Sequence, residues 1–70
     1  MTTPPRTRSY SEQVAANMLN RYGLAAIWQL ELAAARAHLE GNMLAARSIS
    51  DIADAAEREW QRRSAADLRT

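Results

Sequence analysis

A chain of 70 residues forms one small domain at most, and a domain of this size buries only about 60% of the surface that its unfolded chain exposes. The absence of cysteine excludes disulfides and thiolate metal sites, which leaves association with another chain as the expected stabilising element. The net charge of +1 gives no strong field for nucleic acid, and no apolar run is long enough to span a membrane. The N-terminal residues lack the apolar core of a signal peptide, so we expect a cytoplasmic protein.

Three segments are predicted from composition. Residues 1–8 contain both prolines, and because proline lacks an N–H donor and resists helix, we expect a disordered tail. Residues 9–63 are predicted to form a single three-helix domain, and residues 64–70 to fray. No alternating run rich in valine, isoleucine or threonine indicates a strand. The expected fold class is all-α, with a short N-terminal helix followed by an antiparallel helical hairpin.

The first helix is expected to begin at Ser9 and to end at Gly23. Ser9 and Glu12 have the spacing of a capping box, in which each side chain binds the backbone N–H of the other residue. Gly23 tolerates the left-handed conformation that ends many helices. The apolar stripe at helical period consists of Val14, Ala15, Met18, Leu19 and Tyr22.

The second helix is predicted from about Leu24 to Glu40. Its alanine-rich centre favours helix and lets a neighbouring helix approach closely. Gly41 is expected to cap its C-terminus, and Asn42 to cap the N-terminus of the third helix. Its apolar seam consists of Trp28, Leu32, Ala35 and Leu39, broadened by Leu24, Ile27 and Ala34.

The third helix is predicted from about Met43 to Arg63, with a possible break at residues 48–50, where serines could cap a later start. Its polar face places Asp54 before Arg58 and Glu59 before Arg63, both in the favourable i, i+4 order. Its apolar stripe consists of Ala45, Ile49, Ile52, Ala53, Ala56 and Trp60.

Catalytic and metal sites are not indicated by the sequence. His38 is the single histidine, it has no cysteine partner, and it lacks the two-histidine spacing of a zinc site. The carboxylates of the third helix are interpreted as a solvated face paired with arginines. A DNA-reading helix-turn-helix also fails, because Glu40 and Asn42 are polar where the turn glycine needs apolar neighbours. We therefore expect no enzyme, no cofactor and no metal.

Self-association is the predicted function, because a small chain with two tryptophans on apolar stripes has more apolar helix surface than it can cover. Core filling remains the alternative role for these tryptophans. The alternative function is a small nucleic-acid-associated regulator whose Arg6, Arg8, Arg62 and Arg63 contact phosphates. The predicted interface of the homodimer, or of a complex with another helical protein, consists of Trp28, Leu32, Ile49, Ile52 and Trp60.

The chain also resembles a group of short, uncharacterised bacterial helical proteins through three segments: RYGLAA, AHLEGNMLAAR and ISDIADAAEREW. Proteins of that group have a Tyr-Gly, then a Gly-Asp or Gly-Asn, then an Ile-Ala-x-Ala run, as Gly23, Gly41 and residues 52–55 provide here. Group members often have tryptophan near the position of Ile49, where this chain differs. The resemblance covers roughly residues 12–60 and implies a compact helical domain of unknown function, with no site residues to transfer.

Overall fold

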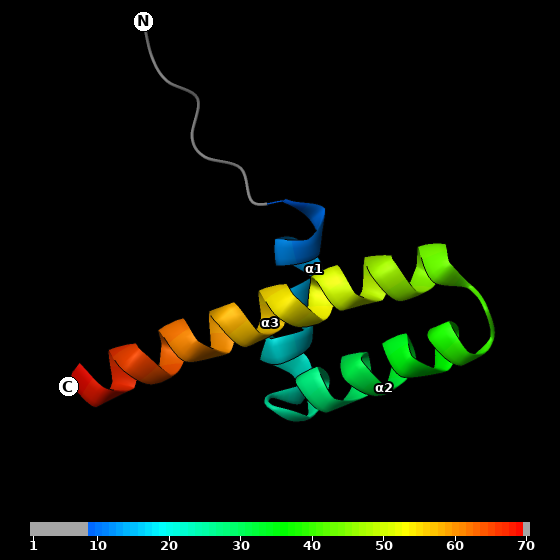
Figure 1. Cartoon of the computed structure of the whole chain (residues 1–70). Helices are drawn as coiled ribbons and strands as arrows, with labels where there is room; N and C mark the ends of the chain where they lie inside the picture. The colour runs from blue at the N-terminus through cyan, green and yellow to red at the C-terminus, as the bar shows by residue number, and fades with distance from the viewer. Residues whose placement is uncertain (1–8, 70) are drawn as a thin grey trace, which may run out of the picture.

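The structure of the chain is a computed structural model that describes residues 9–69. It contains three helices in this range, α1 (Tyr10–Tyr22), α2 (Ala25–Leu39) and α3 (Met43–Arg69), and no strand. Helices α2 and α3 lie side by side as an antiparallel hairpin, and α1 crosses the middle of α3 (Figure 1). The all-α prediction is confirmed, whereas the tail predicted for residues 1–8 lies outside the described residues.

The ends of α1 are set by local chemistry, as the sequence predicts. The Ser9 Oγ accepts a hydrogen bond from the Glu12 N–H at 3.2 Å, and the Glu12 carboxylate accepts one from the Ser9 N–H at 3.0 Å. These two bonds form the capping box, and together they hold the pKa of Glu12 below its usual value. Gly23 ends the helix with a φ of 63°, a conformation that glycine adopts without a side-chain clash.

The turn between α2 and α3 is a Schellman motif followed by an N-cap. The Gly41 N–H donates to the His38 carbonyl at 3.0 Å, and the Asn42 N–H donates to the Ala37 carbonyl at 2.9 Å. Gly41 has a φ of 77°, and the Asn42 Oδ1 accepts a hydrogen bond from the Ala45 N–H at 3.2 Å. The predicted roles of Gly41 and Asn42 are therefore confirmed, and the hairpin reverses within a few residues.

Helix α3 is longer than the sequence analysis expects. It runs without a break through residues 48–50 and continues to Arg69, through most of the segment predicted to fray. The physical reason is composition, because the sequence contains neither glycine nor proline after Gly41 and no residue in it forces a helix to stop. The Glu59 carboxylate also binds the Arg63 side chain one turn later, at 2.9 Å.

The core between the helices is built mainly from alanine. Three of its members, Ala15, Ala26 and Ala56, have no exposed surface at all. Small side chains let helix backbones approach closely, but each buries little apolar area. The described residues accordingly include no large side chain that is fully buried. The buried apolar residues are Ala15, Ala16, Leu19, Ala26, Ile27, Leu30, Ala37, Ala46, Ala53, Ala55 and Ala56.

Candidate protein–protein interface

Helix α2 has apolar residues on two opposite sides. We call one side the core stripe, which consists of Ile27, Leu30, Ala34 and Ala37 and faces the other helices. We call the other side the outer stripe, which consists of Trp28, Leu32, Ala35 and Leu39 and is exposed along its whole length. Both stripes advance by three or four residues, the spacing that keeps side chains on one face of a helix.

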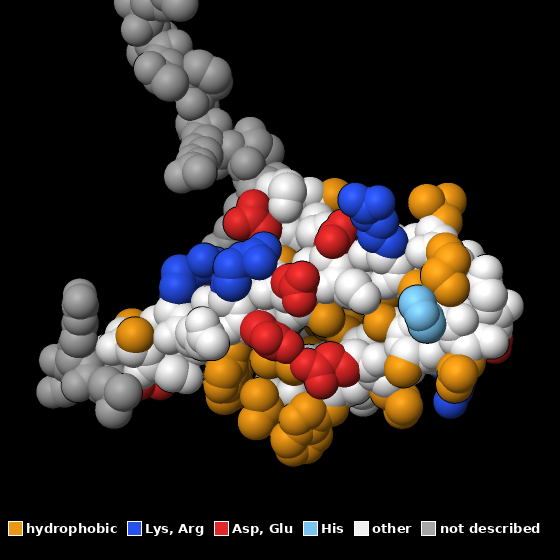
Figure 2. All heavy atoms as spheres, in the orientation of Figure 1, with side chains coloured by type: hydrophobic (Ala, Val, Ile, Leu, Met, Phe, Trp, Pro, Cys, Tyr) orange, Lys and Arg blue, Asp and Glu red, His pale blue; other side chains and the backbone are white. Residues whose placement is uncertain are grey.

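The outer stripe is a large apolar surface for such a small chain. Trp28 is 64% exposed, Leu32 is 63% exposed and Leu39 is 88% exposed. Space-filling atoms in Figure 2 show apolar side chains gathered along the lower edge of the molecule, over α2, and at the end that carries the hairpin turn. Leu24 before α2, and Met43 and Leu44 after the turn, are also exposed. Exposed apolar surface of this kind makes the outer stripe the candidate interaction surface of the described residues.

The sequence analysis describes a single apolar seam on α2, whereas the structure divides the apolar residues of this helix between two faces. Ile27 and Ala34 were treated as the margin of that seam, whereas they belong to the core stripe. The two stripes have the same period, so periodicity cannot separate them. The bulkier stripe lies outside because the face against α3 is packed closely, around small residues such as Ala53 and Ala56.

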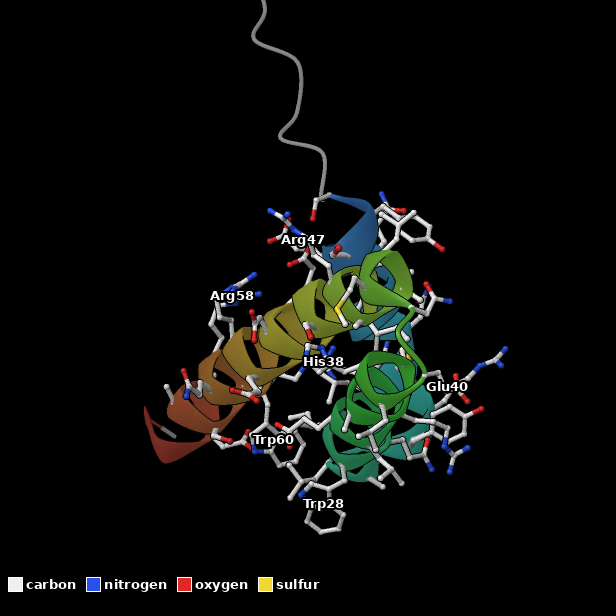
Figure 3. All side chains as sticks on the ribbon, turned by 45° about the vertical axis from the view of Figure 1, so that its right-hand side comes forward. Trp28, His38, Glu40, Arg47, Arg58 and Trp60 are labelled. Atoms are coloured by element: carbon white, nitrogen blue, oxygen red, sulfur yellow. The ribbon has the colours of Figure 1, made fainter. Side chains whose placement is uncertain are left out.

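The five residues of the predicted interface do not form one open surface. Trp28 and Leu32 lie exposed on the outer stripe of α2. Ile49, Ile52 and Trp60 lie on α3, are half-buried and pack against the core. Figure 3 shows the Trp28 side chain directed away from the helices, whereas Trp60 projects from α3 at the hairpin. The two tryptophans therefore take different roles, and only Trp28 is available to a partner over most of its surface.

Charged residues flank the outer stripe on both sides. On the flank toward α3, the carboxyl groups of Glu31 in α2 and Glu57 in α3 are neighbours. Hydrogen bonding to Glu31, loss of solvent and repulsion between the two carboxylates hold the pKa of Glu57 above its usual value. On the other flank Arg36 is exposed and has no ion-pair partner in the described part of the chain. The pair of acids and the unpaired cation were not predicted from the sequence.

The four arginines predicted to contact phosphates do not form an exposed group of unpaired cations in the part of the chain that the structure describes. Arg6 and Arg8 lie outside the described residues. Arg62 and Arg63 both bind the Glu59 carboxylate, and this lowers the pKa of Glu59. Figure 2 shows acidic side chains beside the basic ones on this face of the molecule. Neither Arg62 nor Arg63 is therefore an unpaired cation for a phosphate.

The described residues show no constellation for chemistry. His38 is exposed near the C-terminus of α2, and no group of three or more histidine, aspartate or glutamate side chains in this range is placed to hold a metal. None of the described helices has the length and apolar character needed to cross a membrane. A shallow open groove along α1 contains one cation and no carboxylate, and it is lined by Val14, Asn17, Met18, Asn20, Arg21 and Tyr22.

Comparisons with known proteins return no relatives. The chain matches no protein-family model, no curated protein and no solved structure. The resemblance to short bacterial helical proteins stays a prediction, and any function has to be argued from the surface of this chain.

Proposed function

We propose that the protein is a small non-enzymatic interaction protein that forms a homodimer through the outer stripe of α2. The observation that carries this proposal is the exposure of Trp28, Leu32 and Leu39 on the side of α2 opposite its core stripe. A helix of a globular protein that is apolar on opposite sides is normally buried on both. The hairpin covers one side of α2, and a second chain would cover the other.

A second copy suits this surface because a stripe that runs straight along one helix can meet its own image across a two-fold axis. Its residues repeat with the 4, 3, 4 spacing of helices that pack through a seam. The alanine-rich core supports the same conclusion, since it leaves a chain of this size short of buried apolar area. The half-buried residues of α3 would contribute indirectly, because they pack against the core and hold α3 against α2; these residues are Ile49, Ile52 and Trp60.

The size of the stripe indicates an association of moderate strength. Complete burial of one large apolar side chain contributes roughly 1.5–3 kcal/mol, and the outer stripe of each chain presents three such side chains that are more than half exposed, Trp28, Leu32 and Leu39. Association of two chains costs about 4–15 kcal/mol in lost freedom and ordering of side chains. The balance favours a dimer that forms at micromolar concentration rather than one that persists at picomolar concentration.

Sedimentation velocity across a range of micromolar concentrations tests the proposal. The natural chain is expected to approach the mass of a dimer, whereas Trp28→Gln and Leu32→Gln should sediment as folded monomers at the same concentrations. Tyr10→Gln is the matched control, because Tyr10 is 75% exposed and begins α1, a different helix from the one that carries the outer stripe. A natural chain that stays a folded monomer at every concentration would overturn the proposal, as would dimerisation that survives both α2 substitutions.

A further inference from the structure

The outer stripe has polar flanks whose charges can distinguish between the two ways of pairing α2 with its copy. In heptad terms, Trp28 and Ala35 take d positions and Leu32 and Leu39 take a positions. Glu31 then falls at g and Arg36 at the following e, on opposite flanks of the stripe. The core stripe occupies the c and f positions, which agrees with its burial on the far side of the helix.

A parallel pair would bring the g flank of one helix against the e flank of the other. Charged residues at g of one chain and at e five residues later in the partner can form ion pairs between helices, and Glu31 and Arg36 have this separation and opposite charges. An antiparallel pair would bring like flanks together, so that Glu31 would face the acidic flank of the partner and Arg36 the basic one. Charge therefore favours the parallel arrangement.

Glu31 at g provides the receiving carboxylate on this flank. Glu57 of α3 is its neighbour, close enough for the two carboxyl groups to interact and raise the pKa of Glu57. Two acidic groups held together without a cation are unfavourable as ions, and a guanidinium can donate two parallel hydrogen bonds to carboxylate oxygens. Arg36 is exposed and unpaired within the described residues, so it is available for this purpose.

We propose that two copies of the chain pair α2 against α2 in parallel, and that Glu31 of each copy, with Glu57 beside it, binds Arg36 of the other. This inference rests on the proposed homodimer and adds its orientation and its polar contact. Each dimer would contain two such contacts, related by a two-fold axis parallel to the helices, with the apolar residues of the two outer stripes between them.

Charge reversal tests the polar contact. Glu31→Arg and Arg36→Glu each place like charges opposite one another in both contacts of a homodimer, so each variant alone should dissociate at least about tenfold more readily than the natural chain. Mixing the two variants restores both contacts in the heterodimer, which should form in preference to either homodimer. The double variant Glu31→Arg/Arg36→Glu should also recover self-association. Arg47→Glu is the control, because Arg47 is exposed on α3, far from Trp28 (Figure 3).

Cross-linking tests the orientation, and the absence of natural cysteines makes single substitutions unambiguous. In the parallel dimer the two copies of residue 39 face each other, so Leu39→Cys should form a disulfide between chains under mild oxidation. In an antiparallel dimer a positions face d positions, so Leu39 would face Trp28 of the partner, and two copies of Cys at position 39 would lie about 16 Å apart along the helices, too far for a disulfide. Ala33→Cys is the matched control, because Ala33 is exposed on α2 outside the outer stripe.

The results separate this inference from the proposal on which it rests. Dimerisation of the natural chain, efficient cross-linking at position 39 and preferred heterodimers of the two charge variants support both. Dimerisation with no cross-link at position 39, or with no response to charge reversal, overturns the parallel arrangement and leaves the homodimer standing. A natural chain that sediments only as a monomer overturns both, whatever the variants do.

Discussion

Ile27 and Trp28 are neighbours in the sequence, yet one belongs to the core stripe of α2 and the other to its outer stripe. Ile27 is 6% exposed and packs in the core, whereas Trp28 is 64% exposed and projects into solvent. The larger aromatic side chain is thus outside and the smaller aliphatic one inside. This reversal of the usual preference supports the proposed homodimer, in which a second chain would cover Trp28.

Ile27→Ala and Trp28→Ala are expected to affect different properties. Loss of the buried Ile27 side chain should lower the free energy of unfolding of the monomer by about 2–5 kcal/mol, because it removes core contacts and leaves a cavity. Trp28→Ala should change the stability of the monomer by no more than about 0.5 kcal/mol, as expected at an exposed position. Urea unfolding at a protein concentration too low for dimerisation measures the change in unfolding free energy for both variants. A larger loss for Trp28→Ala than for Ile27→Ala would contradict the two-sided structure of α2.

Because the helices pack closely around α3, a larger side chain at a buried alanine of this helix is expected to destabilise the fold. Ala56 has no exposed surface, so Ala56→Leu has no room for its extra atoms and should destabilise the chain by about 1–3 kcal/mol through displacement of neighbouring helices. Ala66→Leu makes the same change at an exposed position of α3 and should be nearly neutral. Thermal unfolding followed by circular dichroism compares the two variants. Equal effects would show that the alanine core is not tightly packed.

The helix ends of this fold were predictable because each depends on residues within a few positions of it. Ser9 with Glu12, and Gly41 with Asn42, specify their caps by local hydrogen bonds and a left-handed glycine. The C-terminal end of α3 was less predictable, because the segment after Arg63 contains no residue that either stops or specifically favours a helix.

The face of α2 that enters the core could not be predicted, because the choice depends on residues distant in the sequence. Ile27 and Trp28 lie on stripes of equal period, and only the alanines of α3 decide which stripe fits against it. The Glu31–Glu57 contact depends in the same way on the register between α2 and α3. Single-sequence patterns therefore identify apolar surface here, but not which part of it remains exposed.

Gly41 is expected to be more sensitive to substitution than its open surroundings suggest. No atom lies within 4 Å of the place where a side-chain carbon would be added, so Gly41→Ala introduces no collision with distant residues. The φ of 77° is nevertheless strained for an L-residue, at a cost of roughly 1–2 kcal/mol. Gly41→Asn should lose less, because asparagine tolerates this conformation better than alanine. Unfolding free energies that are equal for Gly41→Ala and the natural chain would contradict the left-handed turn.

Glu57→Gln is expected to stabilise the monomer at neutral pH. The contact with Glu31 raises the pKa of Glu57 in the folded chain, so the folded state holds this proton more tightly than the unfolded state. Stability from this group is therefore greatest at acidic pH and is lost as the pH rises from the usual glutamate value through the raised one. Glutamine keeps a hydrogen-bond donor to Glu31 and carries no charge. The Glu57→Gln variant should therefore have a higher free energy of unfolding than the natural chain at pH values above the raised pKa of Glu57, and this difference should shrink at pH values below the usual glutamate pKa.

Urea unfolding midpoints of dilute samples, measured over a series of pH values, test whether the stability advantage of Glu57→Gln grows as the pH rises. Asp54→Asn serves as the control, because it removes one charge from α3 at an exposed position one turn before Glu57. An advantage of Glu57→Gln that grows as the pH falls would contradict the assignment. Glu12 and Glu59 act in the opposite direction, since their lowered pKa values contribute stability that is lost on acidification, and the comparison between variants cancels them.

The same substitution should have the opposite effect on association. In the parallel dimer the partner's Arg36 would offset the repulsion between Glu31 and Glu57, so ionised Glu57 is favourable there and glutamine removes half of the receiving site. Glu57→Gln is thus expected to raise the stability of the dilute monomer while it weakens the dimer severalfold at neutral pH. Sedimentation velocity and unfolding on the same samples measure the two effects together. Tighter dimerisation by Glu57→Gln would show that the acidic pair opposes association, and would contradict its role in binding Arg36.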